Sequence, residues 1–132
     1  MRLTSASVLL AAALLALAPA SMAHHSFAAQ YDRTKPVTLN GTITKLEWMN
    51  PHIYFYVDVK DGVGRVENWA IEGGAPNTML RRGWRKNMLP VGAHVTVDGW
   101  LAKDGSKLAN MREITFADGK KLLAGSSGGD NK

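Results

Sequence analysis

The chain has 132 residues, which is about the length of one domain. Its 16 Lys and Arg against 11 Asp and Glu give a formal charge of +5, a mild excess that suits anionic partners. Because the sequence contains no Cys, disulfides, thiol nucleophiles, thiolate metal ligands and lipid-modified cysteines are excluded.

Residues 1–23 predict a cleavable signal peptide. Arg2 precedes an apolar run from Val8 to Ala18, and Ser21 and Ala23 place small residues at the positions that define cleavage. The run is shorter than the roughly 20 residues that a transmembrane helix needs, and no second long apolar run follows. We therefore expect a periplasmic mature protein that begins at His24, has no transmembrane segment and does not meet nucleic acid.

Residues 24–35 are polar with small apolar interruptions, and they predict an extended N-terminal arm before a first strand at Pro36. From there apolar and polar residues alternate as far as Trp48, with a break in phase after Gly41. A glycine at such a break predicts one long strand that is bent or bulged. Asn50-Pro51 marks the turn that follows.

Alternation is clearest in the second predicted strand. Its apolar residues share one face and are Ile53, Phe55, Val57 and Val59. A polar, glycine-rich loop at residues 61–64 predicts a hairpin to a third strand at residues 65–71. A short helix follows, with Pro76 in its first turn and Gly83 as the stop signal.

Two further strands complete the predicted domain, at residues 93–101 and 107–116, and a short ribbon ends at Leu123. Residues 124–132 have almost nothing to bury and predict a disordered tail. Five to six strands with one short helix between the third and fourth make residues 36–123 an all-β domain, typical of the OB-fold β-barrel. A small β-sandwich is the alternative, but it needs about seven strands.

Three segments carry a family resemblance: HHSFAAQYD from His24, EWMNPHIYFYVDVKDG from Glu47, and NWAIEGGAPNTMLRRGW from Asn68. Through these motifs the chain resembles a family of small exported bacterial proteins known as a domain of unknown function, over His24 to about Ser127. The resemblance implies export and a small β-barrel-like domain, and it supplies neither an activity nor functional residues. The functional argument therefore depends on the residues themselves.

Cleavage after Ala23 would give the mature chain a start with both a free α-amine and an imidazole on His24, followed by a second imidazole on His25. Amine and imidazole nitrogens together favour divalent copper over the other common divalent ions. Both groups reach their neutral, ligating forms near neutral pH. The sequence thus predicts a site for copper or another late transition metal, the alternative being two solvated histidines without a ligand.

Two more histidines, His52 and His94, are predicted at strand starts, on the polar faces of their strands. In an OB barrel both starts flank the end of the first strand, which would place their backbones about 10 Å apart, beside Met49 and Trp48. The thioether of Met49 would favour monovalent copper. In the alternative interpretation, His52 caps the turn and His94 is an exposed strand residue. The predicted ligand set is His24, His25, His52, His94 and Met49.

A cluster of cations around one indole follows the predicted helix: Arg81, Arg82, Trp84, Arg85 and Lys86. Charge-assisted hydrogen bonds from such clusters hold phosphates, carboxylates and anionic head groups. The alternative function is therefore a metal-free interaction module that docks an envelope protein or an anionic glycan. In the structural alternative, the cations follow the helix end and Trp84 plugs the core.

An aromatic face is a third possibility, because OB-folds stack flat ligands on such faces and glycans are the flat ligands outside the cytosol. Its candidate residues are Tyr54, Tyr56, Trp69 and Trp100, for which core packing is the stronger interpretation. The carboxylates of the predicted strands occur singly, and they are Asp58, Glu67, Glu72 and Asp98. No Ser-His-Asp order, phosphate loop or paired-histidine helix motif accompanies them, so the sequence does not predict an enzyme.

Overall fold

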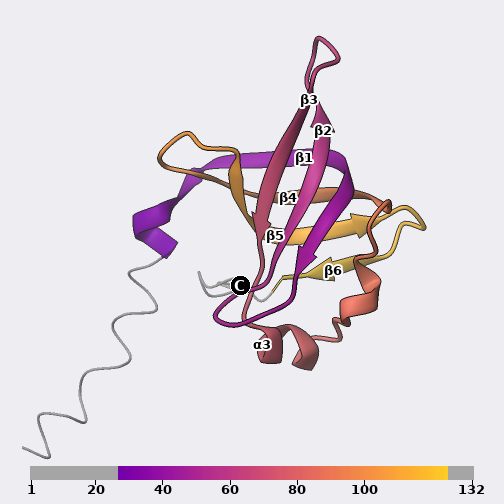
Figure 1. The fold of residues 1–132 in the computed structure, drawn as a ribbon. Helices are drawn as coiled ribbons and strands as arrows, with labels where there is room; N and C mark the ends of the chain where they lie inside the picture. Colours follow the sequence, from indigo (N-terminus) through magenta and orange to yellow (C-terminus); the bar gives the residue numbers. More distant parts are fainter. Residues whose placement is uncertain (1–26, 125–132) are drawn as a thin grey trace, which may run out of the picture.

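The computed structural model describes residues 27–124, which form a six-stranded, mostly antiparallel β-sheet with few helices (Figure 1). The elements in chain order are β1 (Tyr31–Glu47), β2 (Tyr54–Lys60), β3 (Val66–Glu72), α3 (Pro76–Arg81), the 3-10 helix η1 (Lys86–Met88), β4 (His94–Ala102), β5 (Leu108–Phe116) and β6 (Lys121–Leu123). The predicted signal peptide, His24, His25 and residues 125–132 of the predicted tail lie outside this range. No helix within it is long and apolar enough to cross a membrane.

The strand order is β3-β2-β1-β4-β5-β6, so the long strand β1 lies at the centre and pairs with both β2 and β4. β3, at one end of this order, also pairs in parallel with β5 through Ala70–Leu108, Ile71–Ala109 and Glu72–Asn110. The curvature of β1 that brings these strands together is visible in Figure 1. A register shift between Ile43 and Lys45 confirms the prediction of one long, bulged strand.

The hydrophobic core lies on the face that the alternation in β2 predicts. Phe55 and Val57 are fully buried, as are Ile71 of β3 and Ile114 of β5. Because side chains of a strand alternate between faces, the residues between them point to the other side of the sheet. That second face carries the candidate site.

β1 begins at Tyr31, whereas the sequence predicts an extended arm as far as Lys35. The reason is a second apolar cluster of Phe27, Tyr31 and Ala102, against which Trp100 of β4 packs. Tyr31 pairs with Ala102 of β4, and residues 27–30 are helical. The arm prediction is therefore wrong for this part, because two aromatic side chains bind the segment to the sheet.

The helix prediction is confirmed, whereas Ala124, the one described residue of the predicted tail, differs from expectation. α3 begins with Pro76 at its first turn, and Gly83 follows its end with a positive φ of 89°. Ala124, the first residue of the predicted tail, is 1% exposed and donates its N–H to the carbonyl of Arg112 at 2.8 Å. The last described residue is thus tied to β5.

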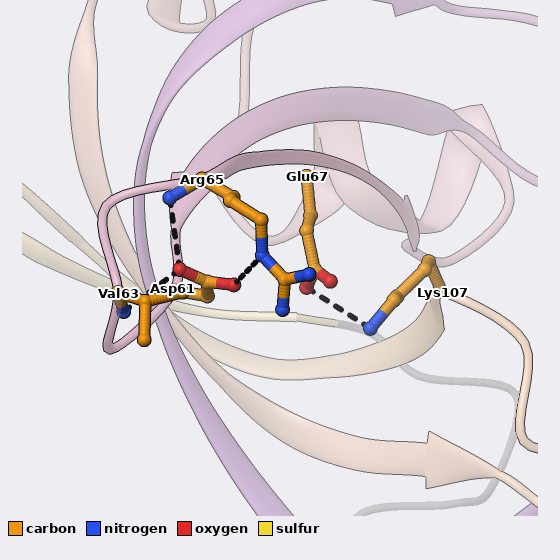
Figure 2. A network of polar contacts seen from close by, with 5 residues as sticks. All are labelled: Asp61, Val63, Arg65, Glu67 and Lys107. Carbon is orange, nitrogen blue, oxygen red and sulfur yellow. Dashed lines mark hydrogen bonds and ion pairs between the residues drawn. The ribbon is translucent and has the colours of Figure 1, made fainter.

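The β2–β3 hairpin projects from the rest of the sheet in Figure 1, and its loop is ordered by one carboxylate. Asp61 Oδ1 accepts the backbone N–H of Val63 at 2.9 Å and of Arg65 at 2.8 Å, and its Oδ2 accepts Arg65 Nε–H at 2.8 Å (Figure 2). Figure 2 also shows the ion pair of Glu67 with Lys107, 2.9 Å, which joins β3 to the residue before β5. The register of this hairpin fixes which residues of β2 and β3 become neighbours.

Candidate functional site

Two polar side chains are buried among the described residues, Glu72 at 3% exposure and Asn110 at 0%. They are direct neighbours across the parallel pairing of β3 with β5. Their chain neighbours Ile71 and Met111 belong to the main core, so Glu72 and Asn110 lie on the other face of the sheet. Buried polar groups away from the core require partners, and those of Glu72 define the site.

Glu72 uses both carboxylate oxygens. Its Oε1 lies 2.5 Å from Nδ1 of His52, and its Oε2 accepts the hydroxyl proton of Tyr31. Tyr54 is the cross-strand partner of Glu72 on β2. The side chain of His52 is 27% exposed, whereas Tyr31 is 2% exposed. One buried carboxylate therefore joins a surface histidine to the beginning of β1.

The loop between β1 and β2 positions His52 close to the end of β3. Ile53 N–H donates to the carbonyl of Gly74 at 3.0 Å, and Gly73 N–H donates to the carbonyl of Ile53 at 2.9 Å. A Cβ on Gly73 would lie 2.6 Å from Cγ1 of Ile53, so only glycine permits this approach. The Gly73-Gly74 pair thus lets the residue after His52 dock beside Glu72.

The electrostatics of the site keep its phenols protonated. Burial, and then the hydrogen bond and charge of Glu72, raise the pKa of Tyr31 well above its ordinary value. Burial and the charge of Glu72 raise the pKa of Tyr54 to about 12. In a neutral imidazole, the hydrogen bond to the carboxylate assigns the proton of His52 to Nδ1. The lone pair of His52 Nε2 is then available for a ligand.

Asn110 is the unsatisfied member of this face. Neither its Nδ2 nor its Oδ1 has a hydrogen-bond partner among the described residues, although the side chain is fully buried. It lies between Glu72 on β3 and Trp100 on β4 in the strand pairings. An unmet buried amide costs about 1–3 kcal/mol, a cost that the packing around it must offset.

His94 lies apart from His52. His94 pairs with Thr42 of β1, while Tyr54, two residues after His52, pairs with Glu47 at the end of β1. At about 3.3 Å per residue, these positions are separated by roughly 15 Å along β1. The prediction that both strand starts flank the same end of β1 is wrong, because β4 begins opposite the middle of that strand.

The other predicted metal ligands are not brought together by the described part of the chain. Met49 is 59% exposed in the loop before His52, and His24 and His25 precede the first described residue. Within residues 27–124 no group of three or more His, Asp or Glu side chains could hold a metal ion. His52 is thus the one predicted ligand that the structure connects to a built polar site among these residues.

Trp84 of the predicted basic cluster is buried at 0% exposure. Its indole Nε1–H donates to the carbonyl of Leu123 at 2.9 Å, and its ring packs on Phe116 with centroids 6.3 Å apart. Trp84 therefore closes the core at the end of β6, as in the structural alternative, and its ring is not available to a partner. The cations around it remain at the surface.

Those cations bind mostly oxygen atoms of neutral groups. Arg85 Nη1–H donates to the carbonyls of Leu80 at 3.1 Å and Trp84 at 2.7 Å, and Arg81 Nη2–H donates to the hydroxyl of Thr78 at 3.2 Å. Arg82 Nη1–H donates to the carbonyl of Ala124 at 3.4 Å, and Lys86 is exposed. We call Arg81, Arg82, Arg85 and Lys86 the basic surface.

The site also contains residues that the sequence does not single out as partners: Tyr31, Glu72 and Asn110. One signal could have found Glu72. The loop at Asp61 and Arg65 fixes the hairpin register, and that register places Glu72 opposite Tyr54, two positions from His52. Tyr31 and Asn110 carry no comparable signal, because their partners come from strands distant in sequence.

The fold and the site define a β-rich domain in which a buried carboxylate holds a surface histidine. A family model described as "Family of unknown function (DUF6152)" matches residues 11–111, and the chain belongs to this family. The resemblance to a family of unknown function is confirmed at that level. The comparisons found no matching curated protein and no matching solved structure.

Proposed function

We propose that the mature protein is an exported, periplasmic domain that binds a late transition metal, with copper preferred, through His52, His24 and His25. The observation that carries the proposal is the 2.5 Å contact between His52 Nδ1 and the buried Glu72 carboxylate. Metal-ligating histidines almost always donate their other ring N–H to a carboxylate, a carbonyl or water, which fixes the ring and raises its basicity. His52 has this arrangement, and its Nε2 has no partner within residues 27–124.

The N-terminal ligands are supported by where the described chain begins. Tyr31 donates to the same carboxylate that holds His52, and the ring centroid of Phe27 lies 5.4 Å from that of Tyr31. In the sequence His25 stands two residues before Phe27, and a chain spans at most about 3.6 Å per residue. The amine and imidazole of His24, the imidazole of His25 and His52 would supply up to four nitrogen ligands, a set that favours divalent copper.

The proposal includes an OB-like barrel as the scaffold. With the parallel pairing of β3 and β5, the strand pairings run β1-β2-β3-β5-β4 and return to β1. α3 lies between β3 and β4 in the sequence. Both features are those of the five-stranded OB-fold. On this scaffold His52 lies in the loop between the first two strands, near the start of β1.

The test is a copper titration of the natively exported, metal-free protein, after intact mass has established its first residue. We expect His52→Ala and the His24→Ala, His25→Ala double variant each to weaken binding at least tenfold, and Glu72→Gln to weaken it about 10- to 100-fold. His94→Ala is the matched control and should bind as the wild type does. Wild-type affinity no higher than that of the double variant, or equal losses in His52→Ala and His94→Ala, would overturn the proposal.

The basic surface supports a second candidate function, a metal-free module that docks an envelope protein or an anionic glycan. Within residues 27–124, Arg81, Arg85 and Lys86 form no ion pair, so their charges are open to an external anion. Binding to an immobilised anionic polysaccharide that weakens with salt and disappears in an Arg81→Ala, Arg82→Ala, Arg85→Ala variant would favour this function. Retention of binding in that variant would exclude this surface as the docking site.

A further inference from the structure

A β-bulge in β5 sets Arg112 apart from the regular ladder. Asp98 of β4 pairs with Glu113 and Gly99 pairs with Met111, so Arg112 is the extra residue between them. Bulges of this kind redirect a side chain and are frequent beside binding and active sites. The bulge is tight, because a Cβ on Gly99 would lie only 2.1 Å from the carbonyl oxygen of Asn110. Gly99 thus allows β4 and β5 to approach where Arg112 turns outward.

The bulge opens onto a surface groove of about 280 Å³, lined by residues 36–38 of β1, residues 98–100 of β4 and Arg112. Its volume is just below the roughly 300–1,000 Å³ of small-molecule sites, so it has room for about one sugar ring. We call it the Trp100 groove. It lies on β1, β4 and β5, whereas the basic surface begins at Arg81, the last residue of α3.

One cation of the Trp100 groove, Arg112, is available to a ligand. The guanidinium of Arg112 forms no hydrogen bond or ion pair with any residue from 27 to 124. The neighbouring carboxylate of Glu113 is paired with Lys121 at 3.1 Å, and Asp98 Oδ1 accepts the hydroxyl of Thr38 at 2.5 Å. The groove therefore offers a planar donor for an anion beside a hydroxyl and a carboxylate that can bind hydroxyl groups.

Trp100 supplies an aromatic wall that is held in place. Phe27 packs on it in a T-shaped contact with ring centroids 5.6 Å apart, and the guanidinium of Arg33 lies 5.5 Å from its ring centroid. A half-buried indole anchored in this way binds a flat apolar surface at little cost in conformational entropy. The CH face of a pyranose ring is such a surface.

We propose that the Trp100 groove binds a uronic acid residue of an anionic glycan. The sugar carboxylate pairs with the Arg112 guanidinium, in the bidentate geometry that arginine offers to carboxylates. The ring packs against Trp100, and its hydroxyls bond to Asp98 and Thr38. A neutral sugar would leave Arg112 unpaired, and a small inorganic anion would leave Trp100 and Asp98 unused. This site is independent of the metal site and of the basic surface.

The test is calorimetric titration of the metal-free protein with digalacturonate, and with the neutral disaccharide cellobiose for comparison. We expect saturable binding of digalacturonate, at least tenfold weaker binding of cellobiose, and at least a tenfold loss in Arg112→Ala. Lys60→Ala, at an exposed cation of β2 outside both the groove and the basic surface, is the control for general positive charge and should bind as the wild type does. Because Arg112 is exposed, the variant should fold, which its thermal unfolding curve checks.

Three results would overturn the proposal. Equal digalacturonate affinity in Arg112→Ala and the wild type would remove the role of the groove. An equal loss in Lys60→Ala and Arg112→Ala would show attraction to the net charge rather than to this groove. Equal affinity for cellobiose would show that the ligand needs no carboxylate. An intermediate variant, Arg112→Lys, should bind more weakly than the wild type, because lysine keeps the charge but loses the bidentate geometry.

Discussion

Tyr31→Phe should destabilise the domain by about 1.5–3 kcal/mol, the usual range for a hydrogen bond to a charged group. The change removes only the hydroxyl that donates to Glu72 Oε2 and keeps the ring that packs against Phe27. Because Glu72 is only 3% exposed, water cannot easily replace the lost donor. The full cost of an unmet carboxylate oxygen should therefore appear in the free energy of unfolding.

The assay is urea unfolding of the metal-free protein, with Tyr56→Phe as the matched control. Tyr56 donates to Glu47 Oε2 at 3.0 Å, but this pair is only partly buried, and Lys45 also contacts Glu47. Its loss should cost less than about 1 kcal/mol. For a domain of this size, the Tyr31 variant should also melt roughly 10 °C lower than the wild type.

The reasoning fails if the free energy of unfolding of Tyr31→Phe is within about 0.5 kcal/mol of the wild-type value. It also fails if Tyr56→Phe lowers the free energy of unfolding as much as Tyr31→Phe does. A double-mutant cycle with Glu72→Gln refines the result, because directly bonded residues should show a coupling of about 0.5–3 kcal/mol. Additive losses would mean that the two side chains contribute to stability separately. The slope of the urea dependence should stay unchanged, since neither variant alters the surface exposed on unfolding.

Three further predictions concern single positions. The folded-state pKa of Tyr54 is raised from 10.0 to about 12. The contribution of Tyr54 to stability is therefore complete below pH 10 and is lost as the pH rises toward 12. Tyr54→Phe should flatten this alkaline fall of the urea midpoint. Asn110→Leu should leave stability unchanged or raise it by up to about 1–3 kcal/mol, and a clear loss in the same assay would reveal a hydrogen bond to the amide. Gly41→Ala should lower the free energy of unfolding by about 1–3 kcal/mol, because its Cβ would lie 2.5 Å from the Asp58 carbonyl oxygen. Gly62→Ala is its control: a Cβ there meets nothing within 4 Å, so this variant should unfold like the wild type.

Local patterns in the sequence determined most of the secondary structure. The alternation that buries Phe55 and Val57 predicted β2 and its core face, and Pro76 and Gly83 predicted the limits of α3. The phase break after Gly41 predicted the bulged form of β1. These features are predictable from the sequence because burial imposes a period of two on a strand, and because proline and glycine act on the backbone at their own positions.

The tertiary structure alone decided which residues share a site. The parallel pairing of β3 with β5 places Glu72 beside Asn110, and the register of β4 on β1 separates His94 from His52. The start of β1 at Tyr31 depends on apolar contacts with β4, a strand that is distant from Tyr31 in the sequence. Alternation gives the face of each strand but not its partner or its register, because these follow from how distant segments pack around one core.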